Sequence, residues 1–420
     1  MKIIADLHIH SHYSRATSRE MNIENLEKFS KLKGLNLIGT GDFTHPYWLE
    51  ELKNSLKEIE NSGLFYFRDP KILFMLQTEV SNVFEKGGKL RKVHNIILAP
   101  SFDIVEQINE FLGKYGSLSS DGRPTLNLNC VELVENLIEI SKDIMIIPAH
   151  AWTPWYGVLG SKSGFDSIEE CFEDQTKNIF AIETGLSSDP SMNWRLSSLD
   201  KFTLVSNSDS HSPWPHRLGR EANVFSLEKI SYWEIINTIK KKDKNKFLFT
   251  IEVDPSYGKY HWDGHRKCKV SMKPKEAEKY GNICPVCGKK LTIGVLHRVE
   301  KLADREENFV PKNAIPFKKL IPLSELIAIA YKTQLFSKKV WSETMKLIEK
   351  FGSELKVLLE VPELELKSIT NEKIVELILK NRKEELKIQP GYDGVYGRII
   401  LEGEIKTKEP QKRIDAYIKK

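Results

Sequence analysis

Three histidines stand close together near the start of the chain, in the stretch "DLHIHSHYS" of residues 6–14. Residues two apart in a β-strand point to the same face, so His8 and His10 share a side, with His12 as a weaker third member. Neutral imidazole is a frequent ligand of transition metals, and rings on one face can share an ion. The His-x-His spacing follows the apolar run "IIADL" and therefore predicts a metal site.

Short apolar runs alternate with helical patterns through residues 1–250, which predicts an α/β fold with a mainly parallel sheet, built as a barrel. Nearly every run ends in a side chain that can bind a metal. The carboxyl ends of parallel strands meet at one mouth of a barrel, so ligands distant in sequence come together there. The expected ligands are His8, His10, Asp42, His45, Glu79, His94, His150, Asp209 and His211.

The order of these motifs resembles the polymerase and histidinol phosphatase (PHP) family, which are metal-dependent phosphoesterases on a distorted β/α barrel. The matching pieces are "HIH", "TGD", "TEV", "VHNIIL", "PAH" and "SDSH". Many members have an adjacent Asp-His pair at the second motif, whereas here Phe43 follows Asp42 and His45 comes two residues later, so Asp42, His45 or both are expected to bind.

The expected chemistry is hydrolysis of a phosphate ester by a cluster of divalent ions, either zinc, magnesium or manganese. Such ions lower the pKa of a bound water and bind the attacking and leaving oxygens of an in-line displacement. Glu79 is the residue expected to bridge two ions. The residues expected to carry catalysis are His8, His10, Glu79, Asp209 and His211.

A second metal motif lies in "GHRKC" and "CPVCGKKL", where a His-x2-Cys pair and a Cys-x2-Cys pair are separated by fifteen residues. This spacing is typical of a tetrahedral structural zinc site, which folds a module rather than catalysing a reaction. His261 and His297 are alternatives for the histidine ligand. Five cysteines are too few for a disulfide scaffold. The predicted zinc ligands are His265, Cys268, Cys284 and Cys287.

The C-terminal part of the chain is basic and helical in pattern. Residues 251–420 contain 34 Lys and Arg against 25 Asp and Glu, whereas residues 1–250 contain 29 against 33. Such a balance fits either a solvated surface or a nucleic-acid footprint. Residues 351–382 resemble helix-hairpin-helix modules, which hold a duplex backbone at helix N-termini, although "SITNE" replaces the usual Gly-x-Gly turn. A purely structural helical bundle is the alternative.

These features predict three parts: a PHP phosphoesterase domain over residues 1–250, a zinc-binding module over 251–308 and a helical, helix-hairpin-helix-like DNA-binding domain over 309–420. The combination resembles the endonuclease Q family of DNA-repair nucleases over nearly the whole chain. The matching pieces include "GDFTHPYW", "HAWTPW", "GHRKC", "ICPVCGKKLT" and "QPGYDGVYG". The resemblance implies nicking of DNA on the 5′ side of uracil, hypoxanthine, xanthine and abasic sites.

Other residues are expected to contact the DNA. Arg217 and Arg220 in "HRLGRE" follow the last ligand motif and are expected to grip a phosphate, with a solvated pair as the alternative. Trp152, Trp155 and Tyr156 are expected to stack on an extruded base or to pack at the barrel mouth. No apolar run approaches the roughly 20 residues of a membrane span, and the chain start lacks a signal-peptide pattern, so a cytoplasmic location is expected.

Two other functions compete with a lesion-specific endonuclease. One is a PHP phosphatase that acts on a small phosphate ester, for which neither a zinc insert nor a basic tail is needed. The other is a DNA-binding accessory protein with an inactive PHP domain, which would be expected to lose one or more ligands. A sliding-clamp partner is left open by the sequence.

Overall fold

The computed structural model describes residues 1–400; residues 401–420 of the predicted helical domain lie outside the described part. The centre of the fold is one eleven-stranded sheet. Its strands are β1 (Lys2–Asp6), β2 (Leu37–Gly39), β3 (Lys57–Glu58), β4 (Phe65–Tyr66), β5 (Leu73–Lys86), β6 (Lys89–Ala99), β7 (Thr125–Leu126), β8 (Met145–Pro148), β11 (Ala222–Ser226), β12 (Phe247–Glu252) and β15 (Phe317–Lys319). The order is β15-β12-β11-β1-β2-β5-β4-β3, with β6 and β7 paired to β5, and β8 to β6.

The sheet is mixed, and the expectation of a mainly parallel sheet was wrong. β1, β2 and β5 are parallel neighbours, but β11 and β12 add to β1 in antiparallel order, and β5 pairs antiparallel with β6 along its length. Gly87 and Gly88, both with positive φ, form the tight turn between β5 and β6, and a hairpin joins only antiparallel strands. A separate parallel pair consists of β9 (Ala181–Glu183) and β10 (Thr203–Val205).

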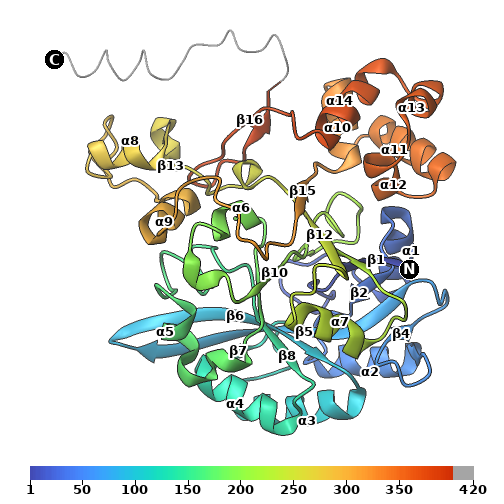
Figure 1. The fold of residues 1–420 in the computed structure, drawn as a ribbon, viewed down its shortest axis with the longest axis vertical. Coiled ribbons are helices and arrows are strands. Elements are labelled where there is room, and N and C mark those ends of the chain that lie inside the picture. Colours follow the sequence, from blue (N-terminus) through green and yellow to red (C-terminus); the bar gives the residue numbers. More distant parts are fainter. Residues whose placement is uncertain (401–420) are drawn as a thin grey trace.

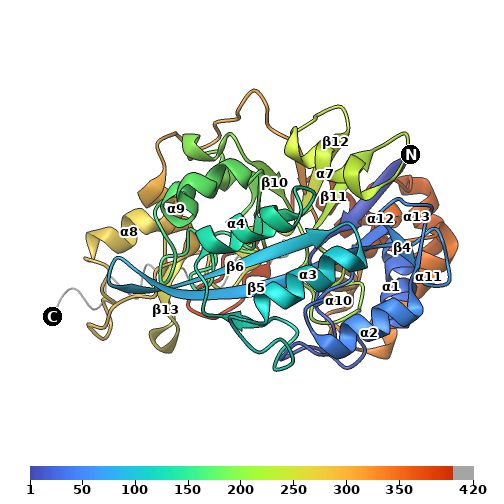
Figure 2. The same cartoon turned by 90° about the horizontal axis from the view of Figure 1, so that it is seen from below.

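Helices cover the sheet because apolar residues lie on both of its faces. Ile4 of β1 belongs to one buried apolar cluster, whereas its neighbours Ile3 and Ala5 belong to another, as the alternation of a strand requires. Figure 2 shows α3 and α4 lying along the ribbon formed by β5 and β6. The helices of this part are α1 (Ile23–Lys33), α2 (Pro46–Ser55), α3 (Phe102–Leu112), α4 (Cys130–Ile140), α5 (Ile168–Phe172), α6 (Pro190–Asn193) and α7 (Tyr232–Lys240).

The helices begin where the sequence supplies capping side chains. Ser101, Asn129 and Ser231 each accept a hydrogen bond from the backbone N–H three residues later, at the starts of α3, α4 and α7. α1 ends at Gly34, whose φ of 98° is the left-handed conformation that glycine adopts freely. These local signals fix the helices that hold the strand ends in place.

A small module lies between β12 and β15 in the chain and packs on the α/β domain. It contains β13 (Asp263–His265), β14 (Val270–Met272), α8 (Pro274–Lys279) and α9 (Val295–Leu302). Arg298 of α9 is buried, and its guanidinium donates to the carbonyl oxygens of Leu159 at 3.0 Å and Phe165 at 2.9 Å. A buried cation with these partners fixes the module to the loop that follows β8.

The C-terminal region is helical, as the sequence predicted, and its helices share an apolar core of their own. They are α10 (Leu323–Tyr331), α11 (Lys338–Phe351), α12 (Glu354–Leu359), α13 (Glu363–Ile369) and α14 (Glu372–Arg382), followed by a short hairpin of β16 (Ile388–Gln389) and β17 (Arg398–Ile399). Lys33 of α1 and Glu354 of α12 are both buried and make an ion pair of 2.8 Å. This ion pair holds the helical domain against the α/β domain.

The small module of β13, β14, α8 and α9 and the helical domain both lie on the same side of the α/β domain, and they are separated from one another (Figure 1). The hairpin of β16 and β17 lies between them. Within residues 1–400, none of the helices has the length and apolar character to cross a membrane.

Candidate metal centre

The predicted ligands follow the ends of several strands and meet in one buried place. His8 and His10 come directly after β1, His150 after β8, and Asp209 after β10, whereas Glu79 lies within β5. His8, His10 and Glu79 are fully buried. Buried ionisable side chains on adjoining strand ends must pair with one another or bind metal.

Two groups of potential ligands share Glu79. In the first, ligand atoms of His8, His10, Glu79 and Asp209 all lie within 4.8 Å of one another. His10 Nε2 is 3.1 Å from Asp209 Oδ1 and 3.2 Å from Glu79 Oε2. This donor set of two imidazoles and two carboxylates suits a transition-metal ion.

The second group consists of Glu79, His94 and His150. Glu79 Oε1 lies 2.8 Å from His94 Nδ1 and 3.0 Å from His150 Nε2. Glu79 therefore turns one oxygen toward each group, so its carboxylate would be able to contribute to a metal site in either group.

The far sides of the two N-terminal histidines are held by carboxylates. His8 Nδ1 lies 3.0 Å from Glu183 Oε2, and His10 Nδ1 lies 3.0 Å from Asp42 Oδ1. His8 Nε2, which faces the first group, is buried and has no hydrogen-bond partner among the described residues. An imidazole oriented by a carboxylate on one nitrogen, with the other left open, is the usual arrangement around a bound metal.

The charge states of Glu79 and His94 suit metal binding. Burial alone would raise the pKa of Glu79, but the positive charge around it, including the Arg123 guanidinium, holds it well below its usual range. Arg123 Nη1 is 3.0 Å from Glu79 Oε2. Burial lowers the pKa of His94 to about 4, so its imidazole is neutral near pH 7. An ionised carboxylate and a neutral imidazole are the forms that bind metal ions.

Backbone strain is concentrated at the same residues. Asp42, His150 and Asp209 have φ of 46°, 29° and 47°, in the left-handed region that non-glycine residues rarely adopt. A Cβ on Gly185 would lie 2.6 Å from His150 Cβ, so only glycine fits behind that ligand. Strain of this kind costs on the order of 1–3 kcal/mol per residue and persists where the surroundings enforce it.

The structure places four of the sequence's candidate histidines and carboxylates outside the two groups. Asp42 supports His10 from behind. His211 lies beside His10, with ring centroids 4.5 Å apart, and its Nδ1 donates to the Asp209 carbonyl at 2.9 Å. His45 is buried with Nδ1 unpartnered in the described chain, and His12 Nδ1 donates to the Met21 carbonyl.

Two residues of the centre were not singled out from the sequence. Glu183 ends the apolar run "IFAIETG" and holds both His8 and the backbone N–H of His150, the latter at 2.8 Å. Its position at a strand end was a usable signal. Arg123 lies in a loop with no periodic pattern, and nothing local marks its contact with Glu79.

The second predicted site also assembles. Its four ligand atoms all lie within 4.8 Å of one another, and Cys287 Sγ is 3.4 Å from His265 Nδ1. His297 instead binds Asp263 at 2.6 Å, and His261 lies outside the group. The group that meets around this point is His265, Cys268, Cys284 and Cys287.

The three aromatic residues predicted to stack on a base differ in exposure. Trp152 is fully buried and donates through Nε1 to Asn193 at 2.8 Å, so it has no face free for a base. Tyr156 is half-buried, and its ring centroid is 4.3 Å from that of His94. Trp155 is 46% exposed, so it is the member of this set that can reach a ligand.

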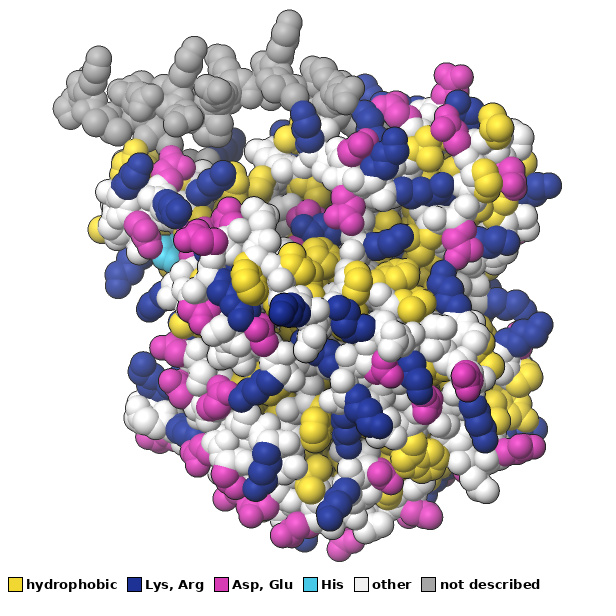
Figure 3. All heavy atoms as spheres, in the orientation of Figure 1, with side chains coloured by type: hydrophobic (Ala, Val, Ile, Leu, Met, Phe, Trp, Pro, Cys, Tyr) yellow, Lys and Arg dark blue, Asp and Glu magenta, His cyan; other side chains and the backbone are white. Residues whose placement is uncertain are grey.

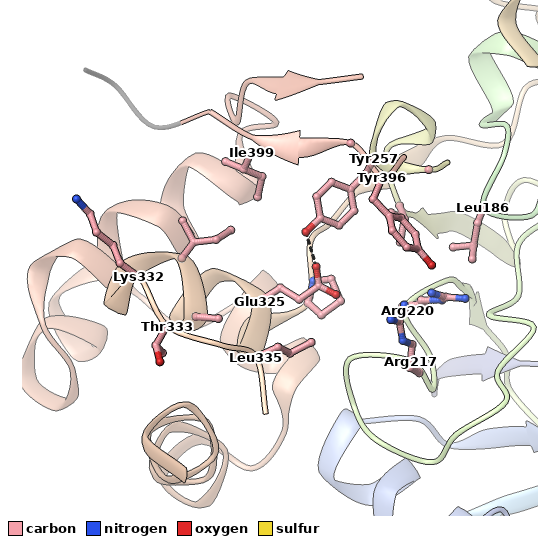
Figure 4. Close-up of a pocket in the computed structure, with 16 residues that line it drawn as sticks. Leu186, Arg217, Arg220, Tyr257, Glu325, Lys332, Thr333, Leu335, Tyr396 and Ile399 are labelled. Atoms are coloured by element: carbon pink, nitrogen blue, oxygen red, sulfur yellow. Dashed lines mark hydrogen bonds between the residues drawn. The ribbon is translucent and has the colours of Figure 1, made fainter. Parts of the chain in front are cut away.

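A cavity of about 660 Å³ lies between the α/β domain and the helical domain (Figure 4). Arg217 and Arg220 line one side, and Glu325 and Tyr257, hydrogen bonded at 2.7 Å, line the other. Arg220 Nη2 donates to the carbonyl of Ser208, the residue before Asp209. Arg220 therefore connects the wall of this cavity to the segment that carries Asp209, although none of the metal-centre ligands lines the cavity.

Solved structures of known function resemble the whole chain. The lesion-specific endonuclease of Pyrococcus furiosus is similar with a TM-score of 0.86 and 35% identity, over 97% of this chain and 98% of that one. A structure of Endonuclease Q in complex with a 27-mer duplex substrate, with an abasic lesion at the active site, is similar with a TM-score of 0.85 and 36% identity, over 98% of this chain and 100% of that one.

Relatives found by sequence match different lengths of this chain. An uncharacterised protein of Methanocaldococcus jannaschii is 39% identical over 252 residues, and the match spans 60% of this chain but 31% of that longer protein. The protein YqxK of Bacillus subtilis is 28% identical over 417 residues, 95% of this chain and 99% of that one. The family described as the MJ0043 C-terminal domain matches residues 322–385, which hold α10 to α14.

Identity of 35% with nearly complete coverage of both chains exceeds what a shared fold alone would give, and it spans the metal centre, the module and the helical domain. The resemblance inferred from the motifs is thus confirmed over nearly the whole chain. This chain belongs to the endonuclease Q family of metal-dependent nucleases.

Proposed function

We propose that this protein is a DNA-repair endonuclease that hydrolyses the phosphodiester bond on the 5′ side of uracil, hypoxanthine, xanthine and abasic sites. The observation that carries the proposal is the pair of ligand groups sharing Glu79, together with a cavity that separates two domains. A similar protein has been captured with a duplex that carries an abasic lesion at its active site, which supports DNA as the substrate.

The residues of the centre fit divalent metal ions. His8 Nε2 has no hydrogen-bond partner among the described residues, and Glu79 belongs to both ligand groups. When bound, such ions supply the Lewis acidity that activates water and offsets charge on a phosphodiester. Glu183 and Asp42 keep the rings of His8 and His10 in place. Arg123 lies against Glu79 and adds a fixed positive charge at the centre.

The metals proposed are zinc in the module and zinc, manganese or magnesium in the catalytic centre. Three thiolates and an imidazole form the soft donor set that selects zinc. The mixture of imidazole and carboxylate in the centre suits zinc or manganese better than magnesium, which prefers oxygen donors.

Phosphate groups of the DNA would meet Arg217 and Arg220 at the cavity. Figure 3 shows Lys and Arg side chains around a hydrophobic region where the helical domain meets the α/β domain. Residues 251–350 contain 20 Lys and Arg against 12 Asp and Glu, whereas residues 351–382 contain 5 against 6. The helix-hairpin-helix-like segment is therefore a weaker phosphate contact than the module and the start of the helical domain.

Reading one altered base within a duplex requires that nucleotide to leave the base stack and enter a pocket. The cavity between the two domains has the size to receive a nucleotide, and Trp155 offers an exposed ring for stacking. A small phosphate ester would also fit this cavity, so a phosphatase is the second function to be tested.

The test compares labelled duplexes that are identical except for a uracil, a hypoxanthine, an abasic site or no lesion. Each is incubated with the protein and Mg²⁺, Mn²⁺ or Zn²⁺, and with a chelator as the control. We expect a metal-dependent nick 5′ of each lesion and an intact undamaged duplex. Equal cutting of all duplexes, or hydrolysis of a small phosphate ester alone, would reject the proposal.

A further inference from the structure

The side chain of Phe336 is largely exposed and does not belong to the apolar core of the helical domain. Phe336, in the loop between α10 and α11, is 78% exposed, which makes it the most exposed aromatic residue within residues 1–400. A large apolar side chain gains stability by leaving water. An exposed aromatic ring is available to a ligand, and the surroundings of Phe336 indicate which one.

The loop that carries Phe336 is well anchored. The backbone N–H of Ser337 donates to the Gln334 carbonyl at 3.0 Å, and that of Thr333 donates to the Ala328 carbonyl at 3.0 Å. The Ser337 hydroxyl then caps α11 by accepting from the backbone N–H of Val340. Phe336 is thus presented on a fixed turn.

Phe336 lines one cavity, and its neighbour Leu335 lines two. Leu335 lines the cavity between the two domains (Figure 4) and also a second, smaller cavity of about 170 Å³. Phe336 lines the smaller one, where its ring centroid is 5.3 Å from that of His216. His216 precedes Arg217, which lines the larger cavity, so Phe336 lies close to the loop that carries Arg217.

The charged side chains around Phe336 suit a nucleic acid. Lys332, Lys338 and Lys339 are exposed on either side of Phe336. The backbone N–H groups at the start of the 14-residue helix α11 lie next to them. Cations and a helix N-terminus attract phosphate, so a duplex backbone would be held on both sides of the exposed ring.

We propose that Phe336 enters the base stack of the DNA and fills the gap left when the damaged nucleotide turns into the cavity between the two domains. This inference rests on the proposed function. Apolar wedges offset the unstacking of a base step, and an aromatic ring stacks on any base regardless of sequence. Phe336 acts through the position of the nucleotide and does not touch the reacting atoms.

The test uses Phe336→Ala, Phe336→Trp and, as a matched control, Leu364→Ala. Leu364 is 81% exposed on α13 and lines neither cavity. Single-turnover nicking is measured on a duplex with a paired uracil and on the same duplex with the uracil in an unpaired bubble. We expect Phe336→Ala to lower the rate on the paired substrate about 10- to 100-fold more than on the bubble.

The tryptophan variant should stay within about threefold of the natural protein, because its ring can also stack. Leu364→Ala should match the natural protein on both substrates. As a second readout, 2-aminopurine beside the uracil should brighten on binding of the Asp209→Asn protein, and adding Phe336→Ala should remove that rise. Unchanged melting would show that the fold is intact.

The outcomes separate the inference from the proposed function. Nicking of the paired substrate by Phe336→Ala at the natural rate, with the fluorescence rise intact, would overturn the wedge and leave the nuclease standing. An equal loss on paired and bubble substrates would also overturn it, since Phe336 would then serve general affinity. Absence of lesion-dependent nicking by the natural protein would overturn the proposed function itself.

Discussion

Replacing Glu183 by glutamine tests whether the residues behind the ligands control metal binding. The Glu183 carboxylate faces three N–H donors: Nδ1 of His8 at 3.0 Å, the backbone N–H of His150 at 2.8 Å and Nδ2 of Asn207 at 2.8 Å. Glutamine has the same shape, but one of its two terminal groups is itself a donor. Whichever way the amide turns, one N–H therefore faces another N–H.

The size of the effect follows from that lost contact. A hydrogen bond to a charged group contributes about 1.5–3 kcal/mol. The loss falls on His8 and His150, which belong to the two different ligand groups. Mutation of such outer residues typically weakens metal binding about 10- to 100-fold, and we expect Glu183→Gln to lie in that range.

The assay is a competition titration of Mn²⁺ or Zn²⁺ against a fluorescent chelator, together with nicking at limiting and at saturating metal. Glu183→Gln should be inactive at limiting metal and recover most of its rate at saturating metal. Glu106→Gln, an exposed glutamate of α3, is the control and should behave as the natural protein. Natural metal affinity in Glu183→Gln would refute the role assigned to this carboxylate.

Three further changes have defined outcomes. Lys33→Ala leaves the carboxylate of Glu354 buried and unpaired, so the free energy of unfolding should fall by about 3–5 kcal/mol in denaturant titrations, and Glu354→Gln should restore part of it. Cys284→Ser should lose one metal equivalent per chain by elemental analysis, whereas Cys130→Ser, outside the group, should keep it. Burial raises the pKa of Glu252 from 4.5 to about 8, so the folded state retains a proton that the unfolded state releases. The free energy of unfolding should therefore fall as the pH rises from about 5 to about 8. Glu252→Gln should flatten the dependence of the melting temperature on pH over that range.

The sequence predicted the parts of the centre that depend on local spacing. His8 and His10 were visible because two residues along a strand return to the same face, and the Cys pairs because a turn brings ligands together. His94, His150 and Asp209 were placed by their positions at or near strand ends. The resemblance to endonuclease Q over nearly the whole chain and the helical C-terminal region were confirmed.

Other features depend on contacts between distant segments. An apolar run has the same pattern in a parallel and an antiparallel strand, and the Gly87-Gly88 pair between β5 and β6 was the sequence signal that could have shown their antiparallel pairing. Trp152 is indistinguishable from Trp155 in sequence, yet one is buried and the other exposed. The contact between Arg123 and Glu79 joins residues 44 positions apart, and no local pattern encodes it.

The measurement that tests the metal centre most directly is nicking by Glu79→Gln, because Glu79 belongs to both ligand groups. Cleavage of a uracil-containing duplex is measured under single-turnover conditions, with duplex affinity and metal content determined on the same sample. We expect the rate to fall at least about a thousandfold and metal content to drop, while duplex affinity stays within about threefold, since the phosphate contacts lie elsewhere. Nicking within about threefold of the natural rate would contradict a catalytic centre built on this carboxylate.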